Sequence, residues 1–313
     1  MLQKKNTSLR VLITGQKGFV GKHYLNLLRS NCNNVTIFED KFDVTNYDLV
    51  EKNIVNFQPD VCVHLAGVTS NQAARSAPNH AWNVNLNGTL NIGHAILKCV
   101  PECRLIFSST SEVWGHSFCS EATVDEKTLL APVNTYSASK AAADLALGAL
   151  AAEGLKVIRF RPFNHTGPGQ DTRFVVPSLA SQVVKIKLGL QPPIINVGNL
   201  SAKRDFLDVR DVADAYVKAT LFNDEIPANI VMPLCSGINR SISDILDELI
   251  SISGIHVQIK IDNTLLRPVD IPITRGSAKL SSDILGWNPT IPWNKTLKDI
   301  LSFLSEIYSK SKF

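Results

Sequence analysis

The chain has 313 residues, of which 44% are hydrophobic and 19% are charged, a composition typical of a globular protein of one large or two coupled domains. A chain of this length buries enough surface to fold without disulfides or a structural metal. Its 32 Lys and Arg residues against 28 Asp and Glu leave a net charge of +4, too small to indicate a nucleic-acid or membrane surface. No run has the apolar length of a signal peptide or membrane span, so we expect a cytoplasmic protein.

The cysteine and histidine patterns exclude the common metal sites. The six cysteines have no CxxC spacing and the seven histidines form no paired cluster. We therefore expect no bound metal, no disulfide framework and buried free thiols.

The first segment of the chain predicts a phosphate-binding loop. The apolar run 10–14 reads as a buried strand, GQKGFVG follows at once, and residues 22–30 have the apolar spacing of a helix. Gly15, Gly18 and Gly21 let the backbone approach a pyrophosphate closely and present its amides at a helix N-terminus. This order of strand, glycine turn and helix is typical of a dinucleotide-binding unit.

The second strand, residues 35–38, ends at Glu39 and Asp40, about 20 residues after the glycines, where a carboxylate usually accepts the ribose hydroxyls of NAD. Lys17 and Lys41 are placed to meet a 2′-phosphate instead, so the choice between NADH and NADPH stays open. Asp43 follows as a polar side chain that an adenine would contact.

Strand and helix patterns then alternate as far as Phe163, which predicts an α/β fold with a doubly wound parallel Rossmann sheet. Helices are expected near 80–99, 135–153, 174–188 and 241–253. The loop NHTGPGQ breaks the rhythm at residue 164. We predict a nucleotide-binding domain of residues 1–163, to which 204–223 return, and a smaller mixed α/β substrate lobe of 164–313, interleaved with it.

A catalytic group is predicted from polar residues at the expected ligand edge of the sheet. Tyr136 and Lys140, in YSASK, are four residues apart on one helix face, and an ammonium beside a phenol lowers its pKa toward the working range. SSTSEVWG ends the preceding strand, where Thr110 is positioned to hydrogen-bond a carbonyl oxygen. The combination, in this order, indicates proton transfer to a carbonyl.

With these motifs the chain resembles the extended short-chain dehydrogenases/reductases that act on nucleotide-sugars, over almost its whole length. TGQKGFVG resembles the cofactor loop of that family, DVTN its adenine contact, VNLNGT the segment of Asn85, and YSASK its catalytic pair. RPFNHTGPGQ, RFVVPS, GLQPPIINVGN, AKRDFLDVRDV and LLRPVDIP resemble the GDP-6-deoxy-D-mannose reductases within the family.

The resemblance implies reduction of GDP-4-keto-6-deoxy-D-mannose by NADH or NADPH, without a metal, in a homodimer. Tyr136 is then the proton donor, Lys140 activates it and anchors the nicotinamide ribose, and Thr110 orients the ketone, with Glu112 also in the catalytic group. The implied cofactor contacts are Gly15, Gly18, Phe19, Val20, Gly21, Glu39, Asp43, Val44, Leu65, Ala66, Gly67, Asn85, Tyr136, Lys140 and Phe163. The implied substrate contacts are Ser111, Asn164, Arg173, Val175, Asn199, Arg204 and Arg267.

Several alternatives stay open from the sequence. A GDP-mannose 4,6-dehydratase needs a base at sugar carbon 5, and Glu112 is placed for it. An epimerase, or a reductase that forms GDP-6-deoxy-talose or a GDP-6-deoxyheptose, leaves no separate mark in the sequence. A non-catalytic dinucleotide sensor would not need Thr110, Tyr136 and Lys140 together.

Overall fold

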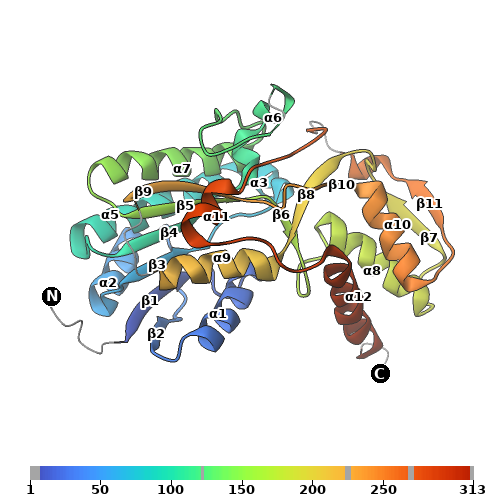
Figure 1. The fold of residues 1–313 in the computed structure, drawn as a ribbon, viewed down its shortest axis with the longest axis horizontal. Coiled ribbons are helices and arrows are strands. Elements are labelled where there is room, and N and C mark those ends of the chain that lie inside the picture. The colour runs from blue at the N-terminus through green and yellow to red at the C-terminus, as the bar shows by residue number, and fades with distance from the viewer. Residues whose placement is uncertain (1–7, 121–122, 223–226, 267–270, 311–313) are drawn as a thin grey trace.

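The computed structural model describes residues 8–120, 123–222, 227–266 and 271–310, and it consists of two lobes that lie side by side (Figure 1). The larger lobe is built on a six-stranded sheet in the order β2-β1-β3-β4-β5-β9, with every neighbouring pair parallel. Its strands are β1 (Leu9–Thr14), β2 (Val35–Phe38), β3 (Val61–His64), β4 (Arg104–Ser108), β5 (Val157–Pro162) and β9 (Asn229–Leu234). The predicted α/β fold with a parallel Rossmann sheet is confirmed.

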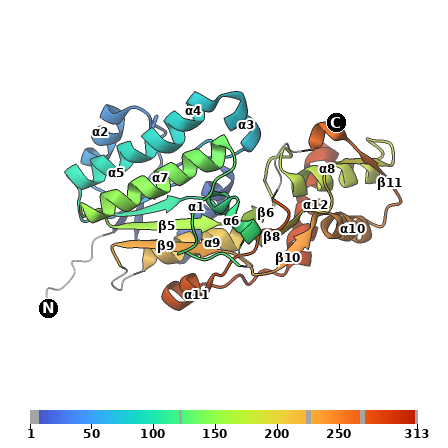
Figure 2. The same ribbon diagram turned by 90° about the horizontal axis from the view of Figure 1, so that it is seen from above.

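Helices cover both faces of this sheet, as Figure 2 shows. One face carries α2 (Tyr47–Phe57), α5 (Gly88–Cys99) and α7 (Thr135–Ala152), and the other carries α1 (Phe19–Asn31), α9 (Val209–Leu221) and α11 (Lys279–Leu285). The strands read as continuous apolar runs because both of their faces are buried in this way. Each layer has its own hydrophobic core, with Tyr24 and Tyr216 on one side and Phe107 and Leu147 on the other.

The smaller lobe is mixed. A three-stranded sheet in the order β10-β8-β6 joins it to the larger lobe, and a two-stranded sheet pairs β11 with β7. The strands are β6 (Asn164–Thr166), β7 (Ile194–Val197), β8 (Lys203–Asp208), β10 (Asn239–Ser241) and β11 (Gln258–Ile261). This lobe has its own hydrophobic core, between α8 (Val175–Lys187), α10 (Ile242–Ser253) and α12 (Trp293–Lys310). A 3-10 turn, Asn263–Leu265, follows β11.

Two details differ from the sequence-based expectations. Segment 204–223 does not return to the larger lobe as a whole: α9 packs on α1, but β8 pairs with β6 and β10. The helix expected over 80–99 is preceded by α3 (Asn71–Ser76) and consists of α4 (Pro78–Trp82), a π-helical turn η1 (Asn83–Asn87) and α5. A π turn inside a helix widens it locally and frequently marks a functional site.

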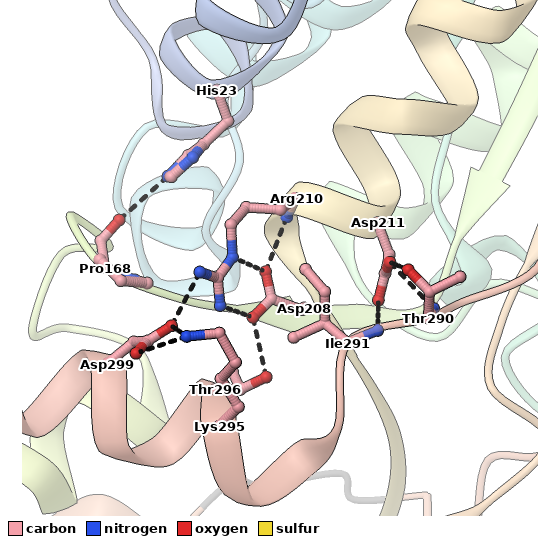
Figure 3. Close-up of polar contacts among 10 residues, drawn as sticks. All are labelled: His23, Pro168, Asp208, Arg210, Asp211, Thr290, Ile291, Lys295, Thr296 and Asp299. Carbon is pink, nitrogen blue, oxygen red and sulfur yellow. Dashed lines mark hydrogen bonds and ion pairs between the residues drawn. The ribbon is translucent and has the colours of Figure 1, made fainter.

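The two lobes are tied together at the start of α9 (Figure 3). Arg210 forms ion pairs with Asp208, at the end of β8, and with Asp299 of α12, both at 2.7 Å. On the far side of this contact, His23 of α1 donates from Nε2 to the carbonyl oxygen of Pro168 at 3.0 Å. The loop that opens the second lobe is therefore held against the glycine-rich end of the first.

All six cysteines are free, but the expectation that they are buried is only partly right. Cys62, Cys103 and Cys235 are buried, Cys32 and Cys99 are half-buried, and Cys119 is exposed. The part of the chain that the structure describes contains no helix long and apolar enough to span a membrane, and no cluster of His, Cys, Asp or Glu side chains that fits a metal ion.

Asp144 forms a buried ion-pair cluster between α7 and β5. Its carboxylate, fully buried, accepts from Arg159 at 2.8 Å and from Arg161 at 3.0 Å. Burial opposes the ionisation of Asp144, but the two guanidinium groups hold its pKa below the usual range. The stability that this carboxylate contributes is therefore present at neutral pH and is lost as the pH falls through its lowered folded-state pKa.

Substitution Asp144→Asn leaves two buried guanidinium groups without a counter-charge, and we expect it to lower the free energy of unfolding by about 3–5 kcal/mol. Urea unfolding at pH 7 measures this loss. Asp283→Asn, which removes the exposed partner of Lys279, is the matched control and should cost no more than about 1 kcal/mol. Equal losses in the two variants would contradict the role assigned to Asp144.

Candidate active site

The glycine loop lies between β1 and α1 and is closed by contacts that only glycine permits. Gly15 has φ +76°, and a Cβ there would lie 2.7 Å from the backbone nitrogen of Ala66. A Cβ on Gly21 would lie 2.4 Å from the carbonyl oxygen of Gly15. The loop is thus packed directly on Leu65 and Ala66, the residues that follow β3, and the cofactor contacts of Leu65, Ala66 and Gly67 stay predictions.

The N-terminus of α1 fits a phosphate group. Gly18 caps it without a side-chain hydrogen bond, and its first turn has no acidic residue. Phe19 and Val20 begin the helix, so the first amides point out of the loop with the positive end of the helix dipole behind them.

Asp43 and Val44, which were predicted to contact the cofactor, both make contacts within the protein. Asp43 accepts from the backbone nitrogen and hydroxyl of Thr45 at 2.9 and 2.8 Å, bonds that lower its pKa. Val44 is buried and in close contact with Gly88, where a Cβ would lie 2.7 Å from it. Their proposed cofactor contacts stay predictions.

Glu39 is not free at the end of β2, because Arg29 of α1 forms an ion pair with its carboxylate. Both side chains are about half exposed, at 45% for Glu39 and 50% for Arg29. The acceptor that was expected to bind ribose hydroxyls therefore has a guanidinium beside it, a group suited to phosphate.

Two of the predicted catalytic residues, Thr110 and Tyr136, come together after the end of β4. Thr110 caps η2 (Ser111–Trp114), and its hydroxyl hydrogen-bonds the phenol of Tyr136, near the start of α7. Burial and the nearby carboxylate of Glu112 raise the pKa of Tyr136 above its usual range, and the Thr110 hydrogen bond opposes this only in part. The phenol is accordingly protonated at neutral pH.

Lys140 is buried in α7 beside the ring of Phe107. Its Nζ lies 4.2 Å from the centroid of the Phe107 ring, and burial lowers its pKa to about 7, an effect that Asp144 opposes. The prediction that the Lys140 ammonium lowers the pKa of Tyr136 is not met in this structure, because burial and Glu112 prevail. Lys140 nevertheless lies on the same helix, one turn beyond Tyr136.

Two asparagines that the sequence analysis did not single out hold Glu112. Asn71 of α3 donates to its Oε2 at 3.1 Å, and Asn134 donates to the same oxygen at 3.4 Å. Asn134 also caps α7, in a capping box with Ser137. Its position two residues before Tyr136 was visible in the sequence, whereas the approach of Asn71 depends on the tertiary fold.

The predicted substrate residues are spread over the smaller lobe and its junction with the larger. Asn164 starts β6, Val175 starts α8, and Ser111 is buried in η2. Arg173 is exposed and paired with Asp171, and Asn199 is exposed, with its Oδ1 accepting from Ser201. Arg204 lies on β8 and donates to the carbonyl oxygen of Lys203, and Arg267 falls outside the described residues.

Phe163 was expected to contact the cofactor, but its ring is buried in an aromatic cluster with Trp114 and Phe118, at centroid distances of 5.7 and 5.9 Å. Its backbone is engaged as well, because its nitrogen donates to the carbonyl oxygen of Leu234 and its carbonyl oxygen accepts from Nδ1 of His165, so the proposed cofactor contact stays a prediction.

Comparison with known proteins agrees with this geometry. The model of the family named "NAD dependent epimerase/dehydratase family" matches residues 11–234. The chain belongs to this family. It is 33% identical to the GDP-6-deoxy-D-mannose reductase of Pseudomonas aeruginosa over 298 residues, which cover 94% of this chain and 96% of that protein.

A second relative and a solved structure are also similar to this chain over nearly its whole length. The GDP-6-deoxy-D-talose 4-dehydrogenase of Aggregatibacter actinomycetemcomitans is 30% identical over 284 residues, 89% of this chain and 92% of that protein. The structure of RMD from Pseudomonas aeruginosa complexed with NADPH superposes with a TM-score of 0.86 at 32% identity, covering 96% of this chain and all of that one. The family resemblance drawn from the sequence motifs is confirmed.

The residues present fit the dinucleotide that the family name implies. The uncapped N-terminus of α1 suits the pyrophosphate, and Glu39 and Arg29 follow and precede β2 with groups that suit a hydroxyl and a phosphate. Asn85 is linked through Ser139 to the turn of α7 that carries Tyr136.

The Arg29–Glu39 pair predicts how the cofactor preference responds to mutation. Glu39→Ala removes a carboxylate that repels a 2′-phosphate and frees the guanidinium of Arg29 to bind it. We expect the ratio of the NADPH to the NADH binding constants to rise about tenfold, a difference of about 1.4 kcal/mol. Fluorescence titration of each reduced cofactor measures the ratio. Asp40→Ala is the neighbouring control, and an equal shift in that variant would argue against the Arg29–Glu39 pair as the determinant.

Proposed function

We propose that the protein reduces the 4-keto group of GDP-4-keto-6-deoxy-D-mannose to form GDP-D-rhamnose, with NADH or NADPH as the hydride donor. The observation that carries this proposal is the placement of Thr110, which caps η2 after the end of β4, beside Tyr136, near the start of α7. A protonated phenol beside a hydroxyl, at the sheet edge that faces the glycine loop, is equipped to protonate a carbonyl oxygen. The similarity to the Pseudomonas aeruginosa reductase over almost the full length supports the substrate.

The mechanism assigns one proton transfer to the chain itself. The bound reduced nicotinamide supplies the hydride to the carbonyl carbon. The hydroxyl of Thr110 orients the ketone, and Tyr136 transfers the proton of its Oη to the carbonyl oxygen as negative charge develops there. Lys140, with a pKa of about 7, is in part an ammonium at neutral pH, and it balances charge in the pocket as the phenol loses its proton.

The nucleotide diphosphate of the substrate requires local positive charge, since the net charge of the chain is only +4. We assign Arg204 and Arg267 to the diphosphate, together with Asn164, on the resemblance of their segments. Guanidinium groups present paired donors to phosphate oxygens and so suit this role. Ser111, Arg173, Val175 and Asn199 complete the proposed substrate contacts.

A GDP-mannose 4,6-dehydratase is the second candidate, and Glu112 is the observation that favours it. A dehydratase needs a base near the proton donor, and Glu112 is close enough to Tyr136 to raise its pKa. Asn71 and Asn134 both donate to Oε2 of this carboxylate and fix its orientation, which leaves Oε1 able to accept a proton. We prefer the reductase because of the similarity to the Pseudomonas aeruginosa reductase, at 33% identity over 94% of this chain.

The stereochemistry at sugar carbon 4 is a separate question, because a GDP-6-deoxy-D-talose 4-dehydrogenase is also similar to this chain. We propose the D-rhamno product from the higher identity and coverage of the reductase.

We further propose a homodimer in the cytoplasm. Helix α7 is rich in alanine and exposes Leu145 at 60%, and it lies in the outer layer with α4 and α5 in Figure 2. Small side chains permit close helix approach between subunits. Six free cysteines agree with a reducing compartment.

The activity is tested by absorbance at 340 nm with GDP-4-keto-6-deoxy-D-mannose and either reduced cofactor, beside an incubation of GDP-mannose with the oxidised cofactor. We expect cofactor oxidation in the first and no reaction in the second, with the product identified by NMR. Keto-sugar formed from GDP-mannose would instead establish the dehydratase.

Tyr136→Phe should lower kcat by roughly 100- to 10,000-fold, because the proton donor is lost. Tyr47→Phe on the remote helix α2 is the control and should leave kcat unchanged.

The dimer is tested by size-exclusion chromatography with light scattering. We expect twice the chain mass of 34.3 kDa, and Leu145→Glu should yield monomers because it places a charge in the apolar contact. A wild-type protein that elutes only as a monomer would refute the proposed contact.

A further inference from the structure

A chain of buried hydrogen bonds runs from the cofactor edge of the sheet to the catalytic helix, and His64 is at its centre. His64 ends β3 and is 1% exposed. Its Nδ1 lies 2.7 Å from the hydroxyl of Thr14 on β1, and its Nε2 lies 3.0 Å from the hydroxyl of Thr89 on α5. Both ring nitrogens are therefore engaged.

The donor and the acceptor in each of these hydrogen bonds are fixed by the groups at the two ends of the series, a carbonyl oxygen and a backbone nitrogen. The Thr89 hydroxyl donates to the carbonyl oxygen of Asn85 at 2.7 Å, and a carbonyl oxygen only accepts. Thr89 must therefore accept from Nε2–H of His64, and a neutral imidazole then accepts at Nδ1, from the hydroxyl of Thr14. The Thr14 oxygen in turn accepts from the backbone nitrogen of Ala66 at 3.2 Å. One tautomer of His64 satisfies all of these groups.

The same chain continues into the catalytic helix. Asn85, in the π turn η1, accepts from the backbone nitrogen of Val68 at 2.8 Å and donates from Nδ2 to the hydroxyl of Ser139 at 2.9 Å. Ser139 donates to the carbonyl oxygen of Tyr136 at 2.9 Å. The loop after β3, the π turn and the first turn of α7 are thus tied to one another.

His64 also lies beside the lysine of the catalytic pair. Its ring is stacked on Phe107 at a centroid distance of 5.9 Å, and the Nζ of Lys140 lies 4.2 Å from the centroid of the same ring. Burial, with the charge of Lys140, lowers the pKa of His64 to about 3, so the imidazole stays neutral. A protonated ring would lose the acceptor at Nδ1 and place a second cation in the pocket.

We infer that His64 is a positioning residue for the reaction: with Thr89 and Asn85 it sets the distance between the cofactor edge of the sheet and the helix that carries Tyr136 and Lys140. This inference rests on the proposed function, since it concerns the placement of the proton donor relative to the dinucleotide. A misplacement of about 1 Å in such a site costs roughly 100-fold in rate.

The chain offers a matched control for the test. Thr220 on α9 is also buried, donates to the carbonyl oxygen four residues earlier, that of Tyr216, at 2.8 Å, and is hydrogen-bonded to a ring substituent, the hydroxyl of Tyr24, at 3.0 Å. Thr89→Val and Thr220→Val therefore each remove one hydroxyl that donates to a helix carbonyl oxygen and is bonded to an aromatic side chain, from equally buried sites. Only the first is in the chain that reaches α7.

We expect both valine variants to lower the midpoint of thermal unfolding by similar amounts, but only Thr89→Val to lower kcat, by roughly 10- to 100-fold. Its primary deuterium isotope effect with 4-deuterated cofactor should rise toward the intrinsic value, because hydride transfer becomes slower than product release. Thr89→Ser keeps the hydroxyl and should restore kcat. Equal kcat values in the two valine variants would overturn the inference.

Two measurements keep the test decisive if Thr89→Val fails to fold or if the substrate proves different. Ser139→Ala cuts the chain at its last link and should show the same loss of kcat, and an unchanged kcat would contradict the inference. In the wild type, imidazole 15N shifts, assigned with His64→Asn, should show His64 as the neutral Nε2–H tautomer between pH 8 and about pH 5. An Nδ1–H tautomer of His64, or titration of its imidazole in the usual pH range of histidine, would contradict the hydrogen-bond directions assigned here, whatever the activity. Failure of the keto-sugar assay alone would count only against the proposed function.

Discussion

The contact of Gly15 with the backbone of Leu65 and Ala66 is the constraint on which the site depends. At this point a side chain has no room, so the ends of β1 and β3 meet without anything between them. The hydrogen bond from Ala66 to Thr14 forms because of this approach, and it leads on to His64. The loop for a pyrophosphate and the first link of the buried polar chain therefore come from one close backbone packing.

Charge in this protein is organised locally rather than over the whole surface. Asp144 forms ion pairs with both Arg159 and Arg161 and raises the proton affinity of Lys140, which burial otherwise lowers. Glu112, in η2, acts in the same sense on Tyr136, whose protonated form it favours. Burial acts in opposite senses on the two groups, because it lowers the pKa of the lysine and raises that of the phenol, so each neutral form is favoured.

The second lobe is attached to the first at the start of α9. Strand β8 leaves the small sheet directly into α9, which packs on α1, and Arg210 at that junction joins Asp208 to α12. His23 holds the loop at Pro168 against the helix that begins at the glycine turn. The two lobes are therefore already in contact through short polar links.

The sequence by itself determined the fold class, the glycine loop, the order of Thr110, Tyr136 and Lys140, and the family, because these are written in local patterns of spacing and residue type. Residues whose role depends on distant partners could not be read in the same way. The pairing of Glu39 with Arg29, the asparagines at Glu112, and the His64 chain arise where segments 10 to 54 residues apart meet. The proton affinities of Tyr136 and Lys140 were decided only by the tertiary structure, because burial removes water from both groups and outweighs the attraction between neighbours on one helix.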